Sequence, residues 1–121
     1  LLISTVHLSD TARGTAPAYI VFGRAVWRER VVLPADADVR LELPAAFDAR
    51  LGVCEATSRA DLNRDGLADV LLSAPEFGHV GRGAAGAVFV LHGRTIWPPV
   101  VSVPDGADVV VLGSREGEGL G

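Results

Sequence analysis

The sequence predicts an all-β protein built from a tandem repeat, and two observations carry this prediction. First, residues 18–41 (AYIVFGRAVWRERVVLPADADVRL) return as residues 88–111 (VFVLHGRTIWPPVVSVPDGADVVV). Second, the apolar runs are about five residues long, rich in Val and Leu, and bounded by Gly, Pro and Asp, as short β-strands are. No window shows the sustained 3.6-residue apolar period of an amphipathic helix.

The two copies align 70 residues apart at their most distinctive positions. These are Tyr19 with Phe89, Gly23-Arg24 with Gly93-Arg94, Trp27 with Trp97, Pro34 with Pro104, and Asp38-Val39 with Asp108-Val109. Chance would not place two tryptophans, two prolines and two Gly-Arg pairs in one register. Because self-similarity at a fixed period marks repeat architectures, we expect two equivalent structural units.

The expected strands follow the repeat. In chain order they cover residues 1–5, 18–23 and 38–43, and then 52–58, 69–74, 86–92 and 108–113. Four short strands per unit, in tandem, are typical of a β-propeller blade of four antiparallel strands. We therefore expect residues 1–51 to hold the last three strands and linker of a partial blade. Residues 52–121 are expected to form a complete blade that ends at the start of the next repeat.

One stretch of the second unit, DLNRDGLADV at residues 61–70, places oxygen-bearing side chains at alternate positions. Like charges at this density repel one another unless a cation lies among them. Calcium takes six to eight oxygens from carboxylates, amides, backbone carbonyls and water. Gly66 permits the sharp turn that such a loop needs. The expected ligands are the side chains of Asp61, Asn63, Asp65 and Asp69 and the backbone carbonyl of Leu67.

Other interpretations of this loop are weaker. An EF-hand would need a Glu at position 12 and flanking helices, but position 12 is Leu72, within an expected strand. A plain Asp-Gly hairpin turn with solvated carboxylates is the simplest alternative, and four alternating ligand-type side chains favour calcium over it. Mg²⁺ demands stricter octahedral geometry, and Arg64 would weaken affinity slightly if it pointed toward the ion. The ion would tie two strands together, a structural role.

These features resemble the FG-GAP repeat of integrin-α-like propellers. The family's Phe-Gly corresponds to Leu51-Gly52, and its Gly-Ala-Pro to Ser73-Ala74-Pro75. Its calcium loop is matched at every defined position of residues 61–69, whereas the first unit has Ser4-Thr5-Val6 in place of Gly-Ala-Pro. The resemblance implies a calcium-stabilised propeller segment of an extracellular or cell-surface protein, acting as an adhesion, ligand-binding or structural module.

The resemblance also leaves alternatives open. The segment could be the accessory propeller of a secreted hydrolase such as a glycosylphosphatidylinositol-specific phospholipase D, or a subunit of an extracellular filament or surface assembly. Because one blade and three strands cannot close a propeller, the expected partners are other blades of the same propeller or neighbouring chains. A protein or glycan ligand is a further possibility, and its identity is not coded in the repeat.

Several other classes of function are disfavoured. A net charge of −4 argues against nucleic acid, and apolar runs of about five residues are far shorter than the roughly 20 of a membrane helix. Residues 81–86 (GRGAAG) fit a G-x-G-x-x-G pattern, but a strand rather than a helix follows, so we expect a hairpin loop. The histidines His7, His79 and His92 have no consistent partners. We expect no catalytic or cofactor-binding residues and no enzyme activity of the segment itself.

Overall fold

The computed structural model describes residues 2–4, 17–43, 60–78 and 83–121, and these residues form strands and turns without a helix. The strands are β1 (Leu2–Ser4), β2 (Ala18–Ile20), β3 (Val39–Glu42), β4 (Val70–Ala74), β5 (Ala87–Leu91), β6 (Val100–Ser102) and β7 (Val109–Leu112). The described residues accordingly offer no helix that could cross a membrane. The all-β prediction is confirmed.

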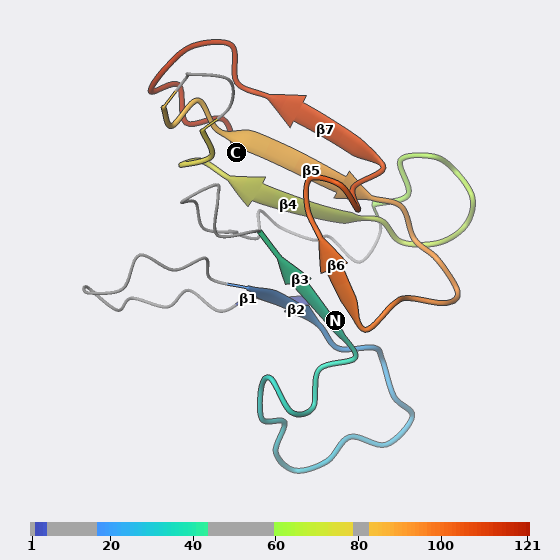
Figure 1. The fold of residues 1–121 in the computed structure, drawn as a ribbon. Coiled ribbons are helices and arrows are strands. Elements are labelled where there is room, and N and C mark those ends of the chain that lie inside the picture. The colour runs from blue at the N-terminus through green and yellow to red at the C-terminus, as the bar shows by residue number, and fades with distance from the viewer. Residues whose placement is uncertain (1, 5–16, 44–59, 79–82) are drawn as a thin grey trace.

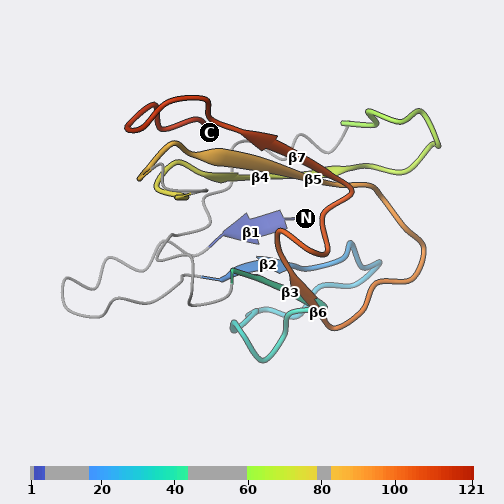
Figure 2. The same cartoon turned by 45° about the horizontal axis from the view of Figure 1, so that its top comes forward.

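The strands form two sheets that lie one above the other. The first has the order β1-β2-β3-β6 and the second the order β4-β5-β7. Figure 2 shows them as two layers, with β4, β5 and β7 above and the first sheet below. Each unit of the repeat therefore builds most of one sheet.

Both sheets share one hydrogen-bonding register, which confirms the predicted equivalence of the units. Tyr19 lies opposite Arg40 between β2 and β3, and its counterpart Phe89 lies opposite Val110 between β5 and β7. β3 and β7 begin and end 70 residues apart, at Val39–Glu42 and Val109–Leu112. The strands expected at 69–74, 86–92 and 108–113 all form. The strand expected at 52–58 lies outside the described residues.

One strand was not predicted. β6 belongs to the second unit in sequence, but it extends the first sheet by pairing in parallel with β3, with Leu41 opposite Val101. The expectation of purely antiparallel blades therefore fails for the first sheet, whose fourth strand crosses over from the other unit (Figure 1). The equivalent residues of the first unit, 30–32, form no strand. Local sequence is thus insufficient to make this strand; a neighbouring edge is also required.

Among the described residues, one hydrophobic cluster joins the two layers. Val39 and Leu41 of the first sheet belong to the same buried cluster as Leu72 and Phe89 of the second. Phe77, in the turn after β4, packs its ring edge against Phe89 with 5.5 Å between the ring centroids. The remaining buried members include Ala18, Ile20, Leu43, Val70, Ala74, Ala87, Leu91, Val101 and Val103. This core fixes the start of β4, where the carboxylate-rich loop ends.

Candidate metal site

The carboxylate-rich loop, residues 60–69, leads directly into β4 and extends beyond the end of the second sheet (green in Figure 1). Asp61 organises the loop, because its two carboxylate oxygens accept hydrogen bonds from the backbone N–H groups of Asp65 and Gly66, each at 3.0 Å. A short acidic side chain that accepts backbone N–H groups a few residues ahead closes a turn without a sheet ladder. The first predicted ligand is therefore also the residue that shapes the loop.

Asn63 and Asp65 lie against each other at the tip of the loop. The Asn63 side-chain amide donates to Asp65 Oδ2 at 2.7 Å, and Asn63 Oδ1 accepts from the Asp65 backbone N–H at 3.1 Å. The other oxygen of Asp65, Oδ1, accepts from the Leu67 N–H at 2.8 Å. The structure thus brings together the side chains of Asp61, Asn63 and Asp65 and the backbone N–H of Leu67. The predicted role of the Leu67 carbonyl as a ligand stays a prediction.

Two residues of the tip have left-handed backbone conformations. Gly66 has a φ of 87°, and Arg64 has a φ of 62°. Glycine adopts this region without steric cost, whereas a residue with a Cβ atom is disfavoured there. The prediction that Gly66 makes the sharp turn is therefore confirmed, and Arg64 contributes strain that the sequence pattern did not reveal.

Asp69, the last predicted ligand, is held differently from the others. Its side chain is buried, with a residue exposure of 2%. Asp69 Oδ2 accepts from the Leu62 N–H at 2.6 Å, and Oδ1 accepts from the Gly93 N–H at 2.8 Å. Burial acts to raise the pKa of Asp69, but these backbone donors and the nearby His92 outweigh it and hold the pKa below its usual value. Asp69 therefore remains charged. It joins the end of the loop to its beginning through Leu62, and to the segment after β5 through Gly93.

Gly93 is a site residue whose role sequence reasoning missed. A Cβ atom at this position would lie 2.5 Å from the Leu67 Cβ and 2.7 Å from the Ala68 carbonyl oxygen. Only glycine therefore allows the segment after β5 to approach the loop closely enough to bond Asp69. The signal was available, because Gly93 repeats Gly23 in register, but the contact spans 24 residues and no local pattern reveals it.

The donor set suits a calcium ion, although its present arrangement is not that of a closed metal cage. Carboxylate and amide oxygens are the ligands that calcium prefers, and each carboxylate oxygen retains lone-pair capacity beyond the single hydrogen bond described above. Among the residues that the structure describes, no three acidic, histidine or cysteine side chains form a metal-holding group. Asp61, Asn63 and Asp65 would hold the ion at the tip, with Asp69 at the base. Bound calcium would supply positive charge there.

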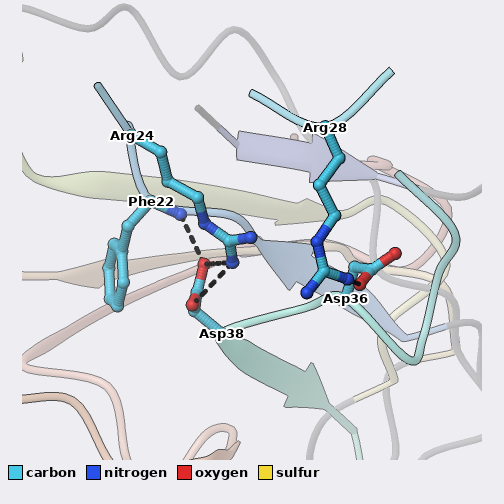
Figure 3. Close-up of polar contacts among 5 residues, drawn as sticks. All are labelled: Phe22, Arg24, Arg28, Asp36 and Asp38. Carbon is cyan, nitrogen blue, oxygen red and sulfur yellow. Dashed lines mark hydrogen bonds and ion pairs between the residues drawn. The ribbon is translucent and has the colours of Figure 1, made fainter. Parts of the chain in front are cut away.

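A second polar motif occurs once in each unit and positions the end of the middle strand. In the first unit, Asp38 accepts from the Phe22 N–H at 2.7 Å and from the Arg24 guanidinium at 3.1 and 3.2 Å (Figure 3). In the second, Asp108 accepts from the His92 N–H at 2.7 Å and from Arg94 at 2.6 Å. In the second unit, the bonds of Asp108 with His92 and Arg94 lie beside Gly93, so they help to fix the segment that contacts Asp69.

The two equivalent tryptophans differ in burial between the units. Trp97 packs against the hydrophobic core and lies under the Arg94 guanidinium, 5.0 Å from the ring centroid. Its counterpart Trp27 is 42% exposed. Trp97 therefore packs on the core, whereas Trp27 remains exposed in the described structure.

Comparison with known proteins agrees with this picture. Residues 55–91, which include the carboxylate-rich loop, β4 and β5, match the FG-GAP repeat family. FG-GAP repeats often bind calcium, and the proteins that carry them are typically extracellular.

A curated relative matches over part of its length. The chain is 38% identical over 55 residues to the phosphatidylinositol-glycan-specific phospholipase D of Rattus norvegicus, which is 46% of this chain and 6% of the phospholipase. The similarity thus concerns a small part of a much longer protein. No solved structure matches the chain. As its motifs predict, the chain carries an FG-GAP repeat.

Proposed function

We propose that the chain is a calcium-stabilised segment of an FG-GAP β-propeller, acting as a ligand-binding, adhesion or structural module of an extracellular or cell-surface protein. The observation that carries the proposal is the loop of residues 60–69, in which four oxygen-bearing side chains are already ordered by hydrogen bonds. A preordered loop loses less conformational entropy when the ion binds. In this proposal the module has no chemistry of its own.

The position of the loop explains what calcium would stabilise. Asp69 joins the loop to the segment after β5 through Gly93, so an ion at the loop would strengthen the attachment of β4 to β5. Calcium would also offset the repulsion between Asp61 and Asp65, which lie in one exposed loop. The expected effect is greater stability of the second sheet rather than catalysis.

If the site has the affinity of an extracellular module, it would be filled only outside the cell. Such sites bind calcium with dissociation constants of about 10⁻⁴ to 10⁻³ M. At millimolar calcium, one site of this kind stabilises the folded state by about 1 kcal/mol. At the far lower calcium concentration of the cytosol the site would be empty, so the stabilisation would be available only outside the cell.

The test is the melting temperature of the chain in millimolar calcium and in chelator, together with calcium titration by calorimetry. Asp65→Asn keeps an oxygen that can accept the Leu67 N–H but removes one negative charge. We expect wild type to melt higher with calcium and the variant to lose most of that increment. Asp105→Ala is the matched control, because Asp105 is exposed, lies outside the loop, and corresponds to Ala35 in the first unit. An equal calcium response in wild type and Asp65→Asn would overturn the proposal.

A second candidate function is an accessory propeller of a secreted hydrolase. It is favoured by the partial match to the phospholipase D of Rattus norvegicus. In this alternative the module would present or position a catalytic domain encoded elsewhere in the protein. The two functions are distinguished by the full-length reading frame: a neighbouring catalytic domain favours the hydrolase, and a membrane anchor with no such domain favours the adhesion module.

A further inference from the structure

The chain contains two Asp-Gly dipeptides, Asp65-Gly66 in the carboxylate-rich loop and Asp105-Gly106 in the turn between β6 and β7. Asp-Gly is the dipeptide at which a polypeptide isomerises most readily. A glycine has no Cβ atom, so its nitrogen can approach the side-chain carboxyl carbon of the Asp before it. Because the two dipeptides have the same covalent structure, any difference in their reactivity comes from the folded chain around them.

This isomerisation has two steps. First the glycine nitrogen bonds to the Asp Cγ atom, and the amide proton, one carboxylate oxygen and one proton from solvent leave together as water. The product is a five-membered succinimide ring. Water then adds to one of the two ring carbonyls and a proton is released. Opening at the main-chain carbonyl gives isoaspartate, in which the chain runs through the former side chain, and opening at the other carbonyl restores Asp.

The Asp65 carboxyl group is held beside the nitrogen that would attack it. Asp65 Oδ1 accepts from the Leu67 N–H at 2.8 Å, and this bond folds the side chain back over the peptide bond that precedes Gly66. Asp65 Oδ2 accepts from the Asn63 side-chain amide at 2.7 Å. Both donors stabilise the negative charge that gathers on these oxygens when a nitrogen adds to Cγ.

The Gly66 N–H points at a group that can take its proton. It donates to Asp61 Oδ2 at 3.0 Å. A carboxylate at hydrogen-bond distance can accept the proton as the new bond to carbon forms, which is general base catalysis. Gly66 is exposed, and a Cβ atom at this position would meet nothing within 4 Å, so its surroundings are open. The loop therefore places a nucleophile, a base and an activated carboxyl group together.

The second dipeptide lacks these features. The Gly106 N–H donates to the Ser102 carbonyl at 2.7 Å, and a peptide carbonyl is a far weaker base than a carboxylate. A Cβ atom on Gly106 would lie 2.6 Å from Val101 Cγ1 and 2.9 Å from the Ser102 carbonyl oxygen, so this glycine is packed against β6. Within the described residues, the Asp105 side chain accepts no hydrogen bond. Asp105-Gly106 is therefore an internal control for Asp65-Gly66.

From this contrast we propose that Asp65 is a site of spontaneous isoaspartate formation, promoted by the fold of its own loop. Asp61 takes the proton from Gly66, while the donors on Asn63 and Leu67 activate the carboxyl group. Isomerisation adds one carbon atom to the main chain at residue 65 and shortens its side chain by one. The modified carboxylate can no longer hold the tip of the loop as Asp65 does.

The modification would also remove one of the predicted calcium ligands. This consequence depends on the proposed function, whereas the isomerisation itself does not. The experiment is therefore carried out in chelator, where the loop holds no calcium.

The experiment incubates the whole chain at neutral pH for several weeks and samples it at intervals. Trypsin cuts after Arg82 and Arg94, which places the two dipeptides on separate peptides. Liquid chromatography separates the Asp and isoaspartate forms of each peptide, and mass spectrometry identifies the succinimide, which is lighter by one water. Asp65 isomerises at least about tenfold faster than Asp105, since a positioned general base typically accelerates a reaction by about 10²–10⁴-fold.

Incubation in guanidinium chloride shows whether the fold causes this difference. The unfolded chain keeps both dipeptides but loses the hydrogen bonds of the loop, so the two rates converge. Asp65 slows on unfolding, whereas Asp105 is released from its turn and does not slow. This measurement needs no variant, so it does not depend on whether an altered loop still folds.

Asp61→Asn tests the base. The Asn side chain keeps an oxygen that accepts a backbone N–H but cannot take up the proton. Isomerisation of Asp65 therefore falls at least about tenfold, while Asp105 is unaffected. Glu116→Gln is the matched control, because Glu116 is exposed, lies outside the loop, and its substitution changes the net charge equally. It isomerises like wild type.

Three results would each overturn the proposal. They are equal rates at Asp65 and Asp105 in the folded chain, a faster reaction of Asp65 in guanidinium chloride than in the folded chain, and an Asp61→Asn variant in which Asp65 isomerises as fast as in wild type.

Discussion

The two units of the chain have the same internal bonding and different surroundings. Both place an Asp immediately before the last strand of the unit, and both use it to hold an Arg and a backbone N–H, at Asp38 and at Asp108. Both also precede this Asp with a cis X-Pro bond, at Pro34 and Pro104. Equivalent residues therefore make the same hydrogen bonds in both units when their partners lie within the same unit.

Equivalent residues of the two units differ in burial where their contacts come from a neighbouring unit or segment. Val39 is buried and Val109 exposed, and Trp97 is packed and Trp27 exposed. Gly93 is in close contact with the loop of residues 60–69, whereas a Cβ at Gly23 would meet nothing within 4 Å. Sequence similarity thus specifies the unit, while burial depends on what lies next to it. This contrast makes one unit a control for the other.

The largest expected difference concerns the matched valines of the outer strands. Val39→Ala removes two methyl groups from the core and is expected to destabilise the chain by about 2–3 kcal/mol. Val109→Ala makes the same chemical change on an exposed surface and is expected to change stability by less than about 0.5 kcal/mol. Urea unfolding of dilute chain measures both. Equal losses would mean that the exposed face of β7 is covered in solution even at low concentration.

The matched glycines come next. Gly93→Ala forces a Cβ against the Leu67 side chain and the Ala68 carbonyl, and is expected to cost about 1–3 kcal/mol. Gly23→Ala has open space and a permitted backbone conformation, so its effect is expected to be close to zero. Thermal unfolding of the two variants side by side gives the comparison. A harmless Gly93→Ala would show that the loop can move away from the segment after β5.

Lowering the pH tests the role of Asp69. Among the described residues, only the second unit carries this carboxylate. The pKa of Asp69 is lower in the folded chain than its usual 3.8, so the stabilisation is complete above that value and is lost as the pH falls through the folded pKa. We expect the amide signals of Leu62 and Gly93 to change together in that acidic range. Asp69→Asn leaves one backbone donor facing an NH₂ group, costs about 1–2 kcal/mol at neutral pH, and abolishes this acid transition. An unchanged acid profile in the variant would contradict the assignment.

The smallest effect is expected from backbone strain at the loop tip. Among the described residues, both non-glycine residues with positive φ, Arg64 and Ala84, belong to the second unit. Arg64→Asn replaces a residue disfavoured in this region by one that tolerates it, and should stabilise the chain by about 0.5 kcal/mol. Arg115→Asn, at an exposed position without positive φ, is the control for loss of an Arg. A matching gain in both variants would point to charge rather than strain.

Sequence alone predicted the features that one unit determines by itself. The register of the repeat located β2, β3, β5 and β7, and the alternate spacing of oxygen-bearing residues located the loop. β6 could not be predicted, because the equivalent residues 30–32 form no strand, although Val31 there matches Val101 of β6. The Asp69–Gly93 bond was missed for a similar reason: Asp69 precedes β4 and Gly93 follows β5, so the two residues meet only after these strands pair.

The crossing of β6 into the first sheet has a consequence for how the chain unfolds. If each sheet were made from one continuous segment, either could melt while the other stayed intact. Because β6 is connected on both sides to strands of the second sheet, unravelling β5 or β7 also pulls on the strand that seals the edge of β3. In a linear array of repeats, such shared elements strengthen the coupling between neighbours. The two units should therefore lose their structure in a single cooperative transition, although they are separate copies of one sequence repeat.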